Sequence, residues 1–72
     1  MSDMEKLKNM EVGKRIKEYT SSQGIKQKYL AKRIGVDDSQ MSKILNGTRE
    51  ININEYLSIC HALNVPIDKF VE

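Results

Sequence analysis

Glycines at positions 24, 35 and 47 interrupt the middle of this 72-residue chain. Each follows a segment whose apolar residues recur at three- and four-residue intervals, which is the spacing of one face of a helix. Glycine readily takes the left-handed conformation with which many helices end. The pattern therefore predicts short amphipathic helices joined by tight turns, and no segment shows the alternation typical of a strand.

Three helices are expected in the first two thirds of the chain. The first runs roughly from Met10 to Ser22 and is ended by Gly24. The second ends at Gly35, and Asp37 can cap the third by accepting a bond from an unpaired amide. The third stops at Asn46-Gly47. The apolar stripes of these helices are, in order, Val12-Ile16-Tyr19, Leu30-Ala31-Ile34 and Met41-Ile44-Leu45.

Two further helices are expected after position 51. Asn52 followed by Glu55 is the pattern of a capping box, in which each residue's side chain accepts from the other's amide. Asn64 is suited to end that helix, and Pro66 is suited to begin a short fifth one, where its missing amide costs nothing. The stripe of the fourth helix is Ile53, Tyr56, Ile59, Cys60 and Leu63, and that of the fifth is Ile67, Phe70 and Val71.

The chain is long enough for one small domain. Its 39% hydrophobic and 31% charged residues fit a soluble folded protein rather than a disordered one. It has no membrane-length apolar run and no signal-peptide-like start, and its single cysteine, Cys60, suits a reducing cytoplasm. We expect a compact all-α domain of five helices over residues 10–72, with residues 1–9 forming either a flexible arm or an extension of the first helix.

The charges are distributed unevenly along the chain. Nine basic and three acidic residues lie between Lys14 and Arg49, a net charge of +6 within a chain whose total is +2. The remainder is therefore acidic, at −4. Lysines coating exposed helix faces are one explanation, and a region that meets a polyanion is the other.

The second and third helices, joined by Gly35-Val36-Asp37, have the arrangement of a helix-turn-helix. Ala31 is small enough to allow a close helix crossing, and Gly35 suits the sharp reversal. The third helix, over residues 38–46, would turn a polar face outward and fit the major groove of DNA. The outward residues are Asp38, Ser39, Gln40, Ser42 and Lys43.

The segment from Gly24 to Gly47, GIKQKYLAKRIGVDDSQMSKILNG, resembles the helix-turn-helix of the lambda repressor/Cro family. The flanking segments VGKRIKEY, ININEYLSICHAL and NVPIDKF resemble the family's first, fourth and fifth helices, so the likeness extends over about Val12 to Val71. It departs at Lys26, where the family usually has a capping Ser or Thr, and at Leu45, which replaces a common glutamate.

The resemblance implies a lambda-repressor-like fold and a set of DNA contacts. Gln27 matches a glutamine that touches a phosphate and can brace the reading helix. Asp38 and Asp37 bring negative charge to the helix end that approaches DNA, and either acid can simply complement the helix dipole. Asp38 can instead accept from the amino group of cytosine. The expected base-reading residues are Asp38, Ser39, Gln40 and Lys43, and the expected phosphate contacts are Lys26, Gln27, Ser42, Asn46, Thr48 and Arg49.

We therefore expect a cytoplasmic, sequence-specific double-stranded DNA-binding protein that regulates transcription as a repressor. Cys60 and His61 are adjacent and point about 100° apart on a helix, so they form no nucleophile–base pair. No enzyme activity, metal, cofactor or small-molecule substrate is expected. A homodimer is expected, with Leu57, Ile67 and Val71 at its interface. The alternative is an antitoxin-like module that binds a partner protein, a role that can coexist with repression.

Overall fold

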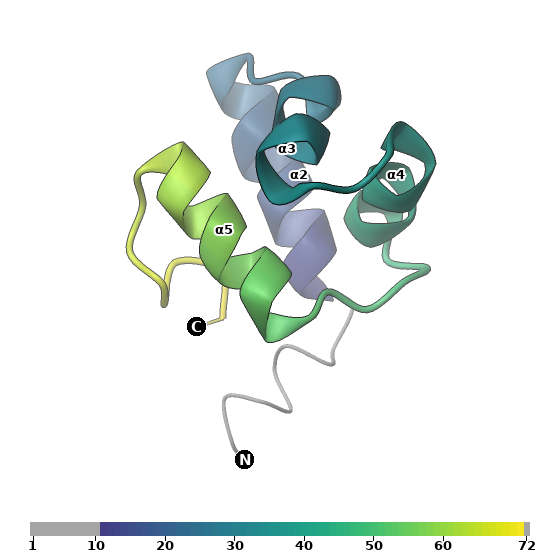
Figure 1. Cartoon of the computed structure of the whole chain (residues 1–72). Helices are drawn as coiled ribbons and strands as arrows, with labels where there is room; N and C mark the ends of the chain where they lie inside the picture. The colour runs from purple at the N-terminus through teal and green to yellow at the C-terminus, as the bar shows by residue number, and fades with distance from the viewer. Residues whose placement is uncertain (1–10, 72) are drawn as a thin grey trace.

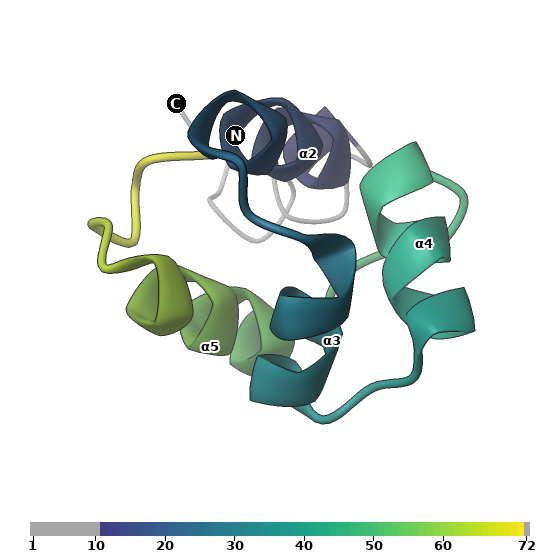
Figure 2. The same cartoon turned by 90° about the horizontal axis from the view of Figure 1, so that it is seen from above.

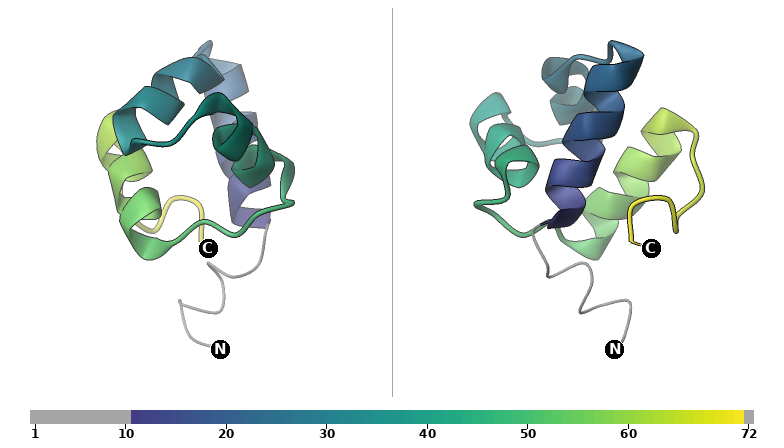
Figure 3. Two further views of the ribbon diagram at one scale, coloured as in Figure 1. Left: turned by 45° about the vertical axis from the view of Figure 1, so that its right-hand side comes forward. Right: turned by 180° about the vertical axis from the view of Figure 1, so that it is seen from behind.

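A computed structural model describes residues 11–71, so the expected arm or helix extension at residues 1–9 lies outside the described residues. The described part contains four helices and no strand: α2 (Glu11–Gln23), α3 (Gln27–Ile34), α4 (Asp38–Asn46) and α5 (Ile53–Leu63). They surround one core (Figure 1). Seen from behind, α2 lies in front, with α4 on one side and α5 on the other (Figure 3). None of these helices is long and apolar enough to cross a membrane.

The helix ends follow the local sequence. Gly35 and Gly47 end α3 and α4 with positive φ angles of 78°, which glycine adopts without strain. Asn64 ends α5 in the same conformation, at φ 57°. Asn52 and Glu55 form the expected capping box at the start of α5. These helix boundaries confirm what the sequence predicts for residues 11–63.

The core contains the apolar stripes of all four helices apart from Ile53, which was expected in the stripe of α5 but is 41% exposed at its start. One close approach holds α2 against α4. Gly13, in the first turn of α2, lies so near α4 that a Cβ atom built on it would be 1.9 Å from the carbonyl oxygen of Ile44. No side chain fits there. The sequence alone indicates no role for Gly13, because a glycine inside a helical pattern only lowers helix stability until its neighbour is known.

The prediction of a fifth helix was wrong. After Asn64 the chain forms turns up to Val71, with only two i to i+3 backbone bonds, from Lys69 to Pro66 and from Val71 to Asp68. Side chains of other helices replace the helical bonds. The Tyr56 hydroxyl donates to the Ile67 carbonyl and accepts from the Phe70 amide, and Arg15 donates to the Phe70 carbonyl at 3.2 Å.

Aromatic packing anchors this C-terminal segment. The ring of Phe70 is buried and meets Tyr19 and Tyr56 edge-on, with ring centroids 5.7 and 6.4 Å away. The segment lies on the opposite side of the molecule from α4 (Figure 2). It therefore completes the core without contributing to the surface that α4 presents.

Candidate nucleic-acid interface

The turn of residues 35–37 joins α3 to α4, as the sequence predicts for a helix-turn-helix. Helix α4 buries one face in the core and turns the other to solvent. Its buried residues are Met41, Ile44 and Leu45, and its outward residues are Asp38, Ser39, Gln40, Ser42, Lys43 and Asn46. The burial of Leu45 accounts for an apolar residue where the family commonly has glutamate.

The start of α4 is held by two hydrogen bonds. The carboxylate of Asp37 accepts from the amide of Gln40 at 2.8 Å, which confirms Asp37 as the cap of this helix. The side-chain amide of Gln27, the first residue of α3, donates to the carbonyl of Asp38 at 3.2 Å. Gln27 therefore braces α4 against α3. Lys26 makes no side-chain cap for α3, so this position lacks the cap that Ser or Thr usually provides in the family.

The four predicted base-reading residues lie together on the exposed side of α4. Asp38, Ser39 and Lys43 are exposed, and Gln40 is partly exposed. Ser39 and Lys43 are four residues apart and so follow one another along the same face. Polar donors and acceptors thus occupy the first two turns of the helix. The structure thus brings the four residues together on one accessible face of α4.

In the loop after α4, Arg49 does not extend outward as its expected phosphate contact requires. Arg49 forms two hydrogen bonds of 2.9 Å to the carboxylate of Glu55. Its side chain is only 30% exposed and that of Glu55 only 10%. The Arg49 bonds, together with a backbone amide bond from Asn52, hold the pKa of Glu55 below its ordinary value despite the burial. Arg49 therefore braces the loop to the start of α5.

Thr48 also closes the end of α4. Its amide and its hydroxyl both donate to the carbonyl of Lys43, at 2.9 and 3.3 Å. Thr48 and Arg49 were both expected to contact phosphate. In the structure each side chain is hydrogen-bonded within the protein. The sequence holds a signal for the pairing of Arg49, because Glu55, the acid of the expected capping box, lies only six residues after it.

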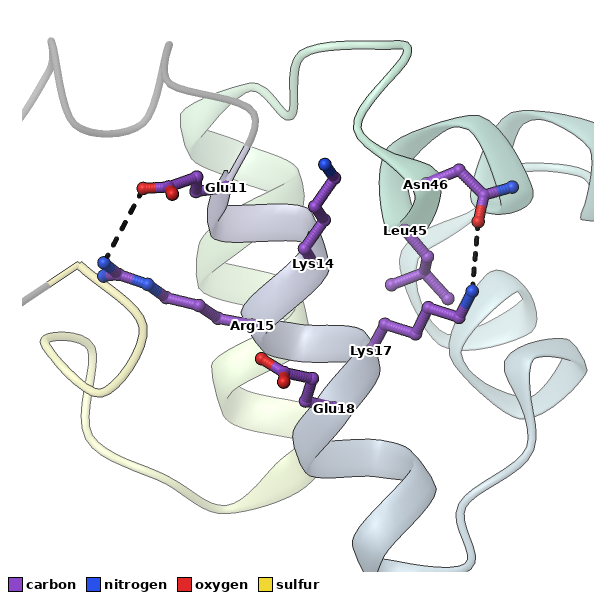
Figure 4. Close-up of a pocket in the computed structure, with 7 residues that line it drawn as sticks. All are labelled: Glu11, Lys14, Arg15, Lys17, Glu18, Leu45 and Asn46. Carbon is purple, nitrogen blue, oxygen red and sulfur yellow. Dashed lines mark hydrogen bonds and ion pairs between the residues drawn. The ribbon is translucent and has the colours of Figure 1, made fainter.

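Helix α2 also places a basic side chain beside the outward face of α4. The ammonium group of Lys17 donates to the side-chain oxygen of Asn46 at 3.2 Å, and the Asn46 amide nitrogen donates to the Ser42 hydroxyl at 3.2 Å. A shallow groove lies beside this chain of bonds, between α2 and the end of α4 (Figure 4). Its lining residues are Glu11, Lys14, Arg15, Lys17, Glu18, Leu45 and Asn46. Lys14 and Lys17 were not among the DNA contacts expected from the sequence.

Comparison with known proteins agrees with this geometry. The sequence model of the helix-turn-helix family matches residues 14–70. The chain belongs to the lambda repressor/Cro-like helix-turn-helix family. This helix-turn-helix domain is 37% identical, over 59 residues, to an uncharacterized transcriptional regulator in the ATPase CF(0) region of Rhodospirillum rubrum. The match covers 82% of the chain and 55% of that protein, so the chain spans about half the length of the curated relative it matches.

The three residues expected at a dimer interface of this helix-turn-helix domain lie in different environments. Leu57 and Ile67 are 42% and 63% exposed, so both apolar side chains lie at the surface of the monomer. Val71 is only 9% exposed and packs in the core, so its apolar side chain is already covered within the monomer. Cys60 is buried, and residues 11–71 contain no group of three potential metal ligands.

Proposed function

We propose that this helix-turn-helix protein binds specific sites on double-stranded DNA and represses transcription, with α4 reading the major groove. The observation that carries the proposal is the division of α4 into a buried apolar face and an outward polar face. The cap at Asp37 and the bond from Gln27 hold this helix in place. A helix presented in this way has the dimensions and the hydrogen-bonding groups that major-groove recognition needs.

The electrostatics support an anionic ligand. The net charge of +6 between residues 14 and 49 is carried almost entirely by exposed lysine and arginine side chains, and Arg49 is the one basic residue of this stretch that is partly covered. Asp37, one of the three acids in the stretch, is used as a helix cap. Such a surface attracts the phosphate backbone of DNA irrespective of sequence.

Specificity is assigned to the outward face of α4. Lys43 can donate to the O6 and N7 acceptors of guanine, Gln40 can pair with adenine, and Asp38 can accept from cytosine. Ser39 can serve either as donor or as acceptor. The proposed phosphate contacts are Lys26, Gln27, Ser42, Asn46 and Thr48, whereas the pairing of Arg49 with Glu55 argues for a bracing role at that position.

We further propose that the protein acts as a homodimer in the cytoplasm. A single domain of this size covers one half-site, and two copies related by a twofold axis would reach half-sites about 34 Å apart. Leu57 and Ile67 provide exposed apolar surface for the contact, and Ile53, four residues before Leu57, extends it along α5. Repression follows if the DNA-bound dimer blocks access of the transcription machinery to the same site.

Selection of bound duplexes from a random pool tests this function. The enriched site, labelled with a fluorophore, is then titrated at a series of salt concentrations beside a duplex of scrambled sequence. Six or so phosphate contacts predict a slope of log K against log salt of about −5, with the enriched site bound more tightly than the scrambled one. Absence of enrichment and of salt-dependent binding would contradict the proposal and favour a module that binds a partner protein.

A further inference from the structure

The side chain of Asn46 connects α2 to the last turn of α4. Its oxygen accepts from Lys17 and its nitrogen donates to Ser42, so both ends of the amide are engaged and its orientation is determined. The ammonium group of Lys17 is thereby held beside the C-terminal end of α4 rather than extended freely into solvent. An ammonium group has three donors, and the contact with Asn46 uses one of them.

Lys14 lies one turn before Lys17 and extends from the same part of α2, whereas Glu11 and Arg15 extend away from α4 (Figure 4). Both lysines are exposed, and neither forms an ion pair with an acid in residues 11–71. Glu11 is paired with Arg15 at 3.9 Å. Glu18 also lines the groove but forms no ion pair with either lysine, so two positive charges stand on the α4 side of α2 without an ion-paired acid in the described part of the chain.

Arg49, the basic residue expected to contact a phosphate at this end of α4, is paired with an acid of α5. Arg49 is held by the carboxylate of Glu55 through two bonds, and leaving that position would uncover a carboxyl group whose side chain is 10% exposed. Two of the expected phosphate contacts have internal partners instead: the side-chain oxygen of Asn46 accepts from Lys17, and the hydroxyl of Ser42 accepts from Asn46. The positive charge available beside them comes from the first described helix and not from the loop.

We propose that Lys17, aligned by Asn46 and joined by Lys14, forms a binding site for a phosphodiester oxyanion of the DNA strand that flanks the C-terminal end of α4. This inference rests on the proposed function, because it assigns a further contact to the same interface. Gln27 and the start of α3 lie at the other end of α4, so the reading helix would be fixed to the backbone at both ends. The contact with phosphate is independent of base sequence.

Salt-dependent binding of the full chain to its selected duplex distinguishes this role from a purely structural one. Each phosphate contact contributes about 0.9 to the magnitude of the slope of log K against log salt. Lys17→Gln is expected to reduce that magnitude by about 0.9, which corresponds to about eightfold weaker binding at 0.1 M salt, and Lys14→Gln/Lys17→Gln by nearly twice as much. Lys17→Arg, which keeps the charge, is expected to preserve the slope.

Lys69→Gln is the matched control, because it removes the same charge from the C-terminal segment on the opposite side of the molecule from α4. Thermal unfolding of each variant checks that the fold is retained. A Lys17→Gln slope equal to those of wild type and Lys69→Gln would overturn the inference while leaving DNA binding intact. Failure of the wild-type protein to bind any duplex would overturn the proposed function, and the inference with it.

Discussion

Replacing Gly13 by Ala tests the contact that places α4 against α2. The new Cβ atom would lie 1.9 Å from the Ile44 carbonyl oxygen and 2.9 Å from its carbonyl carbon. Since real Cβ contacts essentially never fall under 3.0 Å, the two helices must separate by at least about 1.1 Å. The obstacle is backbone rather than a flexible side chain, which places the cost near the upper end of the range of about 1–3 kcal/mol for overpacking.

Alanine also improves helix propensity over glycine, by about 1 kcal/mol. The expected net loss in the free energy of unfolding for Gly13→Ala is therefore about 2 kcal/mol. For a domain of this size that corresponds to a fall in Tm of roughly 8–16 °C. Thermal and urea unfolding followed by circular dichroism measure it directly.

Ser21→Ala is the matched control for Gly13→Ala, because Ser21 is exposed on the same helix. Its effect on stability is expected to stay within about 0.5 kcal/mol of zero. If Gly13→Ala were as stable as wild type, or more stable, the propensity gain alone would account for the result. The close approach of α2 to α4 would then be wrong.

Two further predictions concern polar groups at helix starts. Asp37→Ala removes the acceptor of the Gln40 amide and should lower the free energy of unfolding by about 1 kcal/mol in a urea titration; an unchanged midpoint would mean that another group caps α4. Because the pKa of Glu55 lies below its ordinary value of 4.5, its ion pair stabilises the fold above that pH and is lost as the pH falls through the lowered pKa. Acid unfolding curves should therefore be shallower below pH 4.5 in Glu55→Gln than in wild type, and parallel curves would contradict the assignment.

The helix boundaries were predictable because their causes are local. A cap needs only the residue at the helix end and the amides of the next turn, as at Asp37 and Asn52. Likewise, Gly35 and Gly47 supply a backbone conformation that other residues adopt at a cost. The outward face of α4 followed from the spacing of its apolar residues. The family resemblance added the expected DNA contacts and the bracing role of Gln27, which the structure shows as a bond to Asp38.

The remaining features depend on residues far apart in the chain. Lys17 and Asn46 are 29 positions apart, and no spacing rule connects them. The segment from Pro66 to Val71 had a helical apolar pattern, yet bonds from Tyr56 and Arg15 satisfy its backbone without a helix. Burial of Val71 has the same origin, since the turn directs its side chain into the core. Periodicity alone does not indicate which partner a side chain or a backbone group will meet.

The most direct test of base reading by α4 is a binding matrix of Lys43→Ala against every single-base variant of the selected site. Lys43→Ala should cost about 1–3 kcal/mol on the selected site and abolish the preference at one base pair. Lys69→Ala removes the same charge from the opposite side of the molecule. It should leave unchanged both the affinity for the selected site and the base preference at each position. Equal losses across all variants for Lys43→Ala would show that Lys43 contacts phosphate, and unchanged binding would contradict the placement of α4 in the groove.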